Sequence, residues 1–428
     1  MTLHGQVVAC QGLTLTLDGL APWWRVGTRL NLTPPGQAIL PVEIVGFRDG
    51  LAQALAFAPL DGIGPGIPAW MAPSPGLAVD AGWLGRVLDP LGQSLDGRGP
   101  LPPGRMLRPL RADPPAAGTR ARLGPRLDLG VRALDTFATC RRGQRLGLFA
   151  ASGVGKSTLL AMLAAGADCD VVVLALVGER GRELREFLED DLGPEGLARA
   201  VVVCATSDAP PLMRREAGLA AMTIAEHFAG AGQRVLLLMD SVTRYAMALR
   251  EIGLAAGEPP ATRGYTPSVF AELPRLLERA GPREEGNPGS ITGLFTVLVE
   301  GDDHDEPVAD AVRGILDGHV VLDRKIGERG RYPAVDVLRS LSRTVPGCLE
   351  EAERPLAREA RRILALHADM ADLVRLGAYR AGTDPEVDQA LRLAPRIEAM
   401  LMQGKHERGT VADAFAALAA ALEEDDAG

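Results

Sequence analysis

Short apolar runs alternate with polar turns up to about residue 75 of the chain. The segments GQVVACQ, LTLTLDG, TRLNLT and PVEIVGF alternate or cluster their apolar residues, and Gly or Pro punctuates the sequence between them. Closely spaced short strands of this kind favour a small β-barrel or sandwich. We therefore expect an N-terminal β-barrel domain over residues 1–80.

From about Leu127 to Arg343 the pattern changes to longer apolar runs separated by helical stretches. RLGLFA, VVVLALVGE, AVVVCAT, RVLLLMD and SITGLFTVLVE are β-branched or Leu-rich, as in strands buried on both faces. The Gly/Pro-rich stretch before them, from Pro73 to about Pro125, contains several aliphatic residues and indicates an ordered connection. The alternation predicts an α/β core with a mostly parallel sheet, which we assign to residues 81–345.

From residue 346 to the end of the chain, helical periodicity replaces the strand pattern. Asp384 before Pro385 predicts a helix start, because a capping side chain there precedes a proline at the first helical position. Thr410 with Asp413 predicts a second start. Residues 346–428 are expected to form a C-terminal helical domain.

Composition narrows the class of protein. The 428 residues carry 46 Lys+Arg against 55 Asp+Glu, a net charge of −9, which argues against a surface that is basic overall and coats nucleic acid. The five cysteines are scattered without a C-x-x-C pair, which favours reduced thiols in the cytosol. No signal peptide is visible, and the apolar runs are too short to span a bilayer. We expect a cytoplasmic protein, with at most peripheral membrane association.

The sequence LGLFA-ASGVGKST-LLAML carries the strongest chemical signal. An apolar strand runs into a Gly-rich turn and then a helix, which is the context that a P-loop requires. Backbone amides of such a loop cradle phosphate oxygens, Lys156 reaches the β- and γ-phosphates, and Ser157 offers its hydroxyl to Mg²⁺. The strict motif has Gly where this chain has Ala150. The predicted nucleotide-binding loop comprises Ser152, Gly153, Val154, Gly155, Lys156, Ser157 and Thr158.

Two carboxylates follow buried-type strands. Asp240 ends RVLLLMD, where a carboxylate positions Mg²⁺, although a strand-end Asp also caps turns. Glu179 ends VVVLALVGE, where ligands bind in α/β sheets and where a carboxylate polarises an attacking water. The alternative for GERGRE is a surface cluster of mixed charge.

Several motifs together resemble the catalytic subunits of the rotary ATPase superfamily. They are GERGRE, ASGVGKST, MDSVTRYAMALREIG, TRGYTPSVFAELPRLLERAG, EGDDHDEPVADAVRGILDGHVVLDR and GRYPAVDVLRSLSR. Within the superfamily the chain is most similar to the ATPase of type III protein export, and ERGRYPAVDVLRSLSR and RTVPGC favour the flagellar branch over the injectisome branch. The resemblance implies a RecA-like P-loop core and an ATP-hydrolysing motor that releases or unfolds export substrates.

The resemblance also implies roles for individual residues. Glu179 activates or orients the attacking water, and Arg180 lies near the γ-phosphate. Glu183 and Asp240 serve the Mg²⁺ site, through water, and Arg244 lies beside Asp240 at the nucleotide.

Three further positions follow from the same resemblance. Tyr332 stacks on adenine, and Arg343 is an arginine finger that enters the site of a neighbouring subunit. The family usually has Gly where this chain has Ala151. If that position needs a positive φ, Ala151 is strained by about 1 kcal/mol.

A finger supplied in trans is worth roughly 10³–10⁵ in rate in related enzymes, so we expect an oligomeric ring. The resemblance implies a homohexamer, a central stalk protein, a peripheral stator-like regulator, an export gate at the inner membrane and chaperone–substrate complexes. It implies that the acidic loop with Asp302, Asp303, Asp305 and Glu306 contacts the stalk, an alternative being a metal cluster with His304. The sequence MTLHGQVVA offers no clear N-terminal helix for the regulator.

Other classes of protein stay open on the sequence. The chain could be the catalytic subunit of an F-type ATP synthase, but the block from Ala261 to Arg343 is export-like. It could be a hexameric RNA helicase, but residues 1–75 contain no lysine beside Trp23, Trp24 and Arg25. A nucleotide-binding subunit without turnover would lack the carboxylate of Glu179. We expect no nucleic-acid partner.

Overall fold

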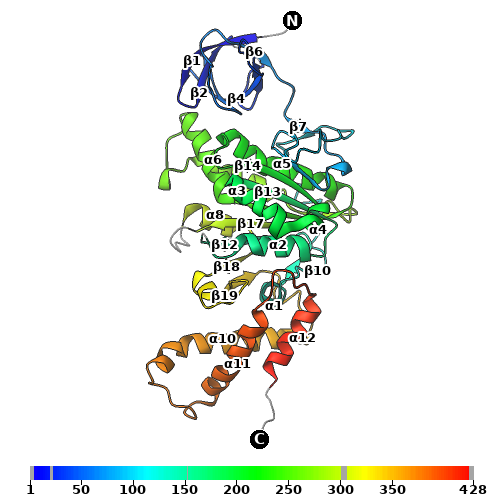
Figure 1. Ribbon diagram of the computed structural model, residues 1–428, viewed down its shortest axis with the longest axis vertical. Helices are drawn as coiled ribbons and strands as arrows, with labels where there is room; N and C mark the ends of the chain where they lie inside the picture. Colours follow the sequence, from blue (N-terminus) through cyan, green and yellow to red (C-terminus); the bar gives the residue numbers. More distant parts are fainter. Residues whose placement is uncertain (1–3, 20–22, 152, 300–305, 424–428) are drawn as a thin grey trace.

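The computed structural model describes residues 4–19, 23–151, 153–299 and 306–423. The chain is elongated, with a barrel at the N-terminal end, an α/β unit in the middle and helices at the C-terminal end (Figure 1). Within the described residues, no helix is long and apolar enough to cross a membrane.

The N-terminal strands close into a barrel in the order β1-β2-β5-β4-β3-β6. Every second side chain points inward, so that Leu15, Leu17, Val42 and Ile44 are fully buried inside it. The predicted barrel is confirmed, although the sequence pattern did not indicate its last two strands, LAQALA and PAWM. The strands are β1 (His4–Gln11), β2 (Thr14–Asp18), β3 (Arg29–Leu32), β4 (Leu40–Arg48), β5 (Leu51–Ala56) and β6 (Pro68–Met71).

The central unit is built on a nine-stranded sheet in the order β19-β18-β12-β17-β15-β13-β14-β8, with β16 paired to β17. All pairings are parallel except β18 with β19 and β16 with β17, so the predicted mostly parallel sheet is confirmed. The strands are β8 (Arg86–Leu88), β12 (Arg145–Ala150), β13 (Val171–Glu179), β14 (Ala200–Thr206), β15 (Arg234–Asp240), β16 (Gly281–Pro282), β17 (Ser290–Leu298), β18 (Gly318–Leu322) and β19 (Val335–Ser342).

Helices cover both faces of this sheet, because its strands are apolar on both sides. Along β13, Val172 and Leu174 belong to one buried cluster with α2, while Val171 and Val173 belong to another with α5 to α8. The central helices are α1 (Arg132–Phe137), α2 (Lys156–Gly166), α3 (Gly181–Glu186), α4 (Gly193–Ala198), α5 (Pro211–Gly230), α6 (Val242–Ala255), α7 (Pro267–Leu277), α8 (Pro307–Ile315) and α9 (Arg324–Glu328).

The Gly/Pro-rich stretch before the sheet is an ordered connection, as the sequence predicts. It contains β8, which extends the central sheet beside β14, and a two-stranded pairing of β7 (Gly76–Leu77) with β9 (Arg108–Pro109). A second small pairing joins β10 (Arg126–Leu127) to β11 (Cys140–Arg141) just before β12. The connection thus leads from the barrel to the strand that precedes the P-loop.

The C-terminal part consists of α10 (Glu353–Arg375), α11 (Pro385–Leu401) and α12 (Val411–Leu422). Both predicted helix starts are confirmed: the side chain of Asp384 caps α11, and Thr410 and Asp413 form a capping box on α12. The buried faces of these helices join the cluster under α1 and α2. The domain limits at residues 80/81 and 345/346 remain proposals.

Candidate active site

The topology brings the predicted site residues to one edge of the central sheet. The strands β12, β17, β15 and β13 are adjacent and parallel, so the P-loop after β12, Asp240 at the end of β15 and Glu179 at the end of β13 share the carboxyl edge. Ligands of open α/β sheets bind at this edge. The fold therefore places the phosphate-binding loop and both carboxylates side by side at one edge of the sheet.

The P-loop turn depends on glycine at two positions. Gly153 has φ of 79° and Gly155 has φ of 86°, a left-handed conformation in which other residues are strained. Ala151 has no positive φ, so the strain that the sequence analysis attached to this position is absent. Ser152 lies outside the described residues.

Lys156 is held between two carboxylates. Its Nζ lies 2.5 Å from Oδ1 of Asp240 and 3.5 Å from Oε1 of Glu179. The hydroxyl of Thr296 on β17 donates to the same Oδ1 of Asp240 at 2.7 Å. Because Asp240 is only 4% exposed, these donors compensate a carboxylate that would otherwise be costly to bury. Thr296 was not predicted from the sequence, although a hydroxyl residue within the apolar run SITGLFTVL could have indicated it.

Glu179 has an environment that makes it a stronger base. Burial raises the pKa of its carboxyl above the ordinary value, and the positive charge of Lys156 opposes this rise. The negative charge of Asp240 adds to the rise. A carboxylate with a raised pKa accepts a proton from water or orients it better than an exposed Glu does.

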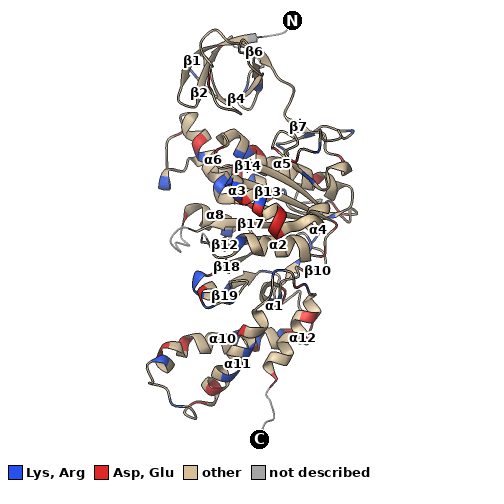
Figure 2. Cartoon of the chain, in the orientation of Figure 1, with Lys and Arg blue, Asp and Glu red and all other residues tan. Residues whose placement is uncertain are grey.

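A cavity of about 700 Å³ opens in front of these groups. It is lined by the loop, by Glu179 and by three predicted charged residues, Arg180, Glu183 and Arg244, whereas Asp240 lies behind Lys156. Charged residues of both signs gather around α3 at this edge (Figure 2). The lining also includes residues that the sequence analysis did not single out: Leu298, Val299 and Arg324.

Arg180 and Glu183 face solvent and pair with each other. The Nη1 of Arg180 lies 2.8 Å from Oε1 of Glu183, and the Arg180 side chain is 75% exposed. Arg244 packs more tightly, because its aliphatic stem lies against Gly178, where a Cβ would come within 3.2 Å of it. The exposed pair borders the cavity, while Arg244 is fixed beside the end of β13.

Tyr332 packs against the P-loop from the C-terminal side of the core. A Cβ built on Gly155 would lie 3.4 Å from its ring, and one built on Gly327 would lie 3.0 Å from its hydroxyl oxygen, yet the residue is 47% exposed. The Tyr332 carbonyl accepts a hydrogen bond from the backbone N–H of Gln403 at 2.8 Å, so the helical region anchors this segment. The aromatic face beside the loop is suited to a flat ring.

Among the predicted site residues that the structure describes, Arg343 alone lies away from this edge. It follows β19, which runs antiparallel to β18, so it lies at the opposite end of the sheet. Strands rise about 3.3 Å per residue, and the length of β12 separates Arg343 from its own P-loop by roughly 20 Å. Its side chain is exposed. The acidic residues Asp302, Asp303 and Asp305, with His304, lie outside the described residues.

The five cysteines are all free in the structure. Among the described residues, no group of three or more His, Cys, Asp or Glu side chains is arranged to hold a metal ion by itself.

Comparisons with known proteins agree with the geometry. Residues 130–342 match the ATP synthase alpha/beta family, nucleotide-binding domain, and residues 349–420 match the T3SS EscN ATPase C-terminal domain. The flagellum-specific ATP synthase of Caulobacter vibrioides is 53% identical over 99% of this chain and 97% of that protein. The type 3 secretion system ATPase of Xanthomonas euvesicatoria is 46% identical over 94% of this chain and 90% of that protein.

Solved structures agree over the whole chain. The assembled ATPase EscN of the enteropathogenic E. coli type III secretion system has a TM-score of 0.90 at 38% identity, covering 98% of this chain and 100% of EscN. EscN in complex with its central stalk EscO has a TM-score of 0.88 over the same shares. The chain belongs to the family of flagellar and type III secretion ATPases, enzymes that bind and hydrolyse ATP.

Proposed function

We propose that this chain is the ATP-hydrolysing motor of flagellar type III protein export, which releases or unfolds export substrates from chaperones at the export gate. The observation that carries the catalytic part is the placement of Lys156 between Glu179 and Asp240 at the end of the P-loop strand. The flagellar assignment is supported by 53% identity to a flagellum-specific relative against 46% to a type 3 secretion system ATPase.

The roles of the site residues follow from their positions. The amides of residues 152–158 hold the phosphates, with Lys156 on the β- and γ-phosphates. Glu179 holds and deprotonates the attacking water, and its raised pKa supports that role. Arg180 and Arg244 neutralise phosphate charge from the cavity wall. Tyr332 stacks on adenine, since its half-exposed ring lies beside the loop.

A magnesium ion fits the donors at this edge. Ser157 lines the cavity, and Asp240 and Glu183 supply carboxylate oxygens, the hard ligands that Mg²⁺ prefers. Ser157 would bind it directly, and Asp240 and Glu183 would hold its water ligands. When bound, the ion neutralises charge on the phosphates. The chain's own share of catalysis is to position the phosphates and the water.

The chain forms a ring, which we propose to be a homohexamer in which Arg343 completes the site of the next subunit. Support comes from the exposed position of Arg343 far from its own P-loop and from the similarity to assembled EscN. The similarity to EscN bound to EscO supports a central stalk partner. We further propose a peripheral regulator, chaperone–substrate complexes and an export gate as partners, with the ring in the cytoplasm against the inner membrane.

The direct test measures ATP hydrolysis and export separately. Purified protein should hydrolyse ATP, and single-stranded RNA should not stimulate it; stimulation by RNA would instead support a helicase. In a strain that lacks the endogenous flagellar ATPase, the chain should restore flagellin secretion and motility, while Glu179→Gln should not. Restoration of injectisome secretion alone would contradict the flagellar assignment.

A further inference from the structure

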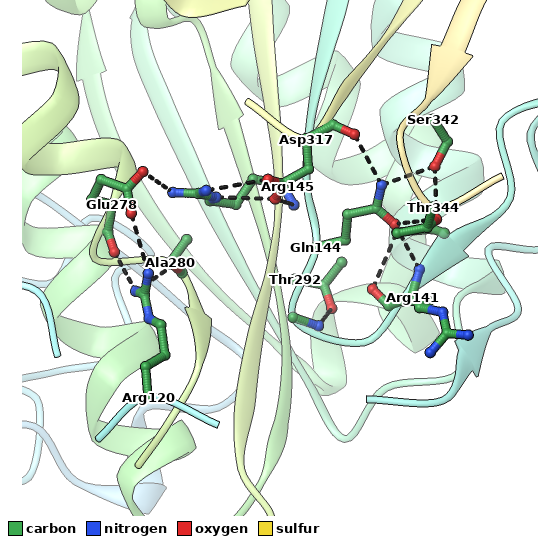
Figure 3. A network of polar contacts seen from close by, with 12 residues as sticks. Arg120, Arg141, Gln144, Arg145, Glu278, Ala280, Thr292, Asp317, Ser342 and Thr344 are labelled. Atoms are coloured by element: carbon green, nitrogen blue, oxygen red, sulfur yellow. Dashed lines mark hydrogen bonds and ion pairs between the residues drawn. The ribbon is translucent and has the colours of Figure 1, made fainter. Parts of the chain in front are cut away.

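A second polar network lies at the end of the central sheet opposite the P-loop (Figure 3). Its centre is Gln144, which is fully buried and precedes β12 directly. The side-chain amide of Gln144 takes part in four hydrogen bonds. Nε2 donates to the hydroxyl of Ser342 at 2.9 Å and to the carbonyl of Asp317 at 3.2 Å, and Oε1 accepts from Thr344 and from the backbone N–H of Arg141.

The partners of Gln144 flank Arg343 on both sides. Ser342 is 1% exposed and Thr344 is half-buried, whereas Arg343 between them is exposed. The hydroxyl of Ser342 also donates to the carbonyl of Thr139 at 2.9 Å, and the hydroxyl oxygen of Thr344 lies 3.3 Å from the same carbonyl oxygen. The two neighbours of Arg343 are therefore tied to the sheet through their side chains.

The backbone of Arg343 is tied to the same point. Its N–H donates to the carbonyl of Asp317 at 2.9 Å, the carbonyl that also accepts from Gln144. The carboxylate of Asp317 is in turn fixed by two bonds from the Arg145 guanidinium, at 3.1 Å and 3.2 Å, and Arg145 is held from the other side by Glu278 at 2.5 Å. Residues 342–344 are thus all hydrogen-bonded to Gln144 or to the carbonyl of Asp317.

The pairing of the strands at this end of the sheet does not depend on the side chain of Gln144. The backbone N–H of Arg343 bonds to the Asp317 carbonyl without Gln144, and the strand pairing of β18 with β19 ends at Ser342. What Gln144 adds is the fixed position of the side chains on either side of Arg343. A displacement of about 1 Å in a catalytic group can cost 10²-fold in rate.

We propose that Gln144 is a positioning residue for Arg343: it locks Ser342, Thr344 and the Asp317 carbonyl so that the guanidinium projects into the neighbouring subunit's site. The inference rests on the proposed role of Arg343 as a finger in trans. It adds that Gln144, which lies roughly 20 Å from its own P-loop along β12, serves hydrolysis in the next subunit.

A double-mutant cycle tests this proposal. Gln144→Leu keeps the side-chain volume and removes all four hydrogen bonds. In the otherwise unchanged protein it should lower kcat about 10- to 100-fold while leaving the KM for ATP within about twofold. In the Arg343→Ala background it should cause no further loss, because the group that it positions is gone.

Two further variants keep the test informative. Thr344→Val removes only the bonds of one hydroxyl, and it replaces Gln144→Leu in the cycle if the latter does not fold. Thr292→Val is the matched control: Thr292 is buried at the same end of the sheet and accepts from Gly143 N–H at 2.9 Å, but its hydroxyl makes no hydrogen bond to residues 342–344. It should leave kcat unchanged.

The outcomes separate the two proposals. Normal kcat in both Gln144→Leu and Thr344→Val, or an equal loss with and without Arg343, would overturn the positioning role while leaving the finger intact. A normal kcat in assembled Arg343→Ala would overturn the finger itself. Fluorescent-nucleotide binding and the mass of the assembled ring, measured for each variant, confirm that the change lies in turnover.

Discussion

The two ends of the central sheet both carry dense polar networks, but the networks are built differently. At the carboxyl end, Lys156 and Glu179 form an ion pair and both line a cavity of about 700 Å³. At the amino end, the side chains of Gln144 and Ser342 are buried and hydrogen-bonded to each other, whereas Arg343 is exposed. The network that lines the cavity can bind a ligand, whereas the buried network holds the residues around Arg343 in position.

The difference explains how one chain can contribute to two sites. In the proposed mechanism, the carboxyl end supplies the loop, the base and the aromatic ring of one nucleotide site, and the amino end presents Arg343 to the site of the next subunit. Because roughly 20 Å of strand separates the ends, no single subunit brings all the groups together.

The largest loss of kcat is expected from changing Arg343, the exposed arginine at the amino end of the sheet. Arg343→Ala should lower kcat by about 10³- to 10⁵-fold, because a trans finger stabilises charge that develops on the phosphate in the transition state. Nucleotide affinity should change little. Steady-state ATPase assays on the assembled variant, with light scattering for its mass, measure both. If the assembled Arg343→Ala variant kept normal turnover, the amino end of the sheet would contribute no catalytic group.

A smaller loss is expected from the base at the carboxyl end. Glu179→Gln should lower kcat by about 10²- to 10⁴-fold, since general base catalysis contributes on that order. The wild-type rate should fall as pH drops through the pKa of Glu179, because hydrolysis needs the carboxylate. Burial raises that pKa, so the fall should begin at a higher pH than for an exposed Glu.

The pH profile supplies the control for this prediction. Glu179→Gln should lose the acid limb of the profile, whereas Glu183→Gln, whose parent carboxylate is paired with Arg180 at the rim, should keep it. An unchanged acid limb in Glu179→Gln would assign the base to another group.

Tyr332→Ala should act on binding more than on turnover. Stacking of a base on an aromatic ring is worth about 1–3 kcal/mol, so the KM for ATP should rise roughly 5- to 150-fold while kcat at saturation changes little. Tyr332→Phe is the matched control and should retain the affinity. Isothermal titration with ADP measures the change, and equal affinities in all three proteins would exclude an adenine platform at this position.

The smallest effect is expected at Ala151. Because its φ is not positive, Ala151→Gly relieves no strain and should lower the free energy of unfolding by about 0.4–1 kcal/mol, through the greater freedom of Gly in the unfolded chain. ATPase activity should stay within about twofold. Chemical denaturation and ATPase assays check both, and a large gain in rate would show that Ala151 distorts the loop.

The carboxyl end was largely predictable from the sequence, and the amino end was not. Lys156, Glu179 and Asp240 each follow a continuous apolar run, and parallel strands necessarily deliver their ends to one edge. The residues around Gln144 come from positions 139 to 348, at strand ends and in turns that share no sequence pattern. Only pairing in space, through β18 and β19, brings them together.

The barrel illustrates the same limit. Its first four strands alternate leucine and valine with polar residues, but β5 reads LAQALA, and alanine favours strands only weakly. Closure of the barrel, not local preference, makes β5 a strand between β2 and β4. Thr296, too, becomes part of the site only because β17 lies between β12 and β15.

The central claim is that each active site needs a second copy of the chain, and the most direct measurement is specific ATPase activity against protein concentration, with the mass of the species recorded at each point. Activity should rise steeply with concentration and follow the assembled fraction, with the isolated monomer about 10³-fold or more slower. A monomer that hydrolyses ATP at the full rate of the assembled protein would contradict the account.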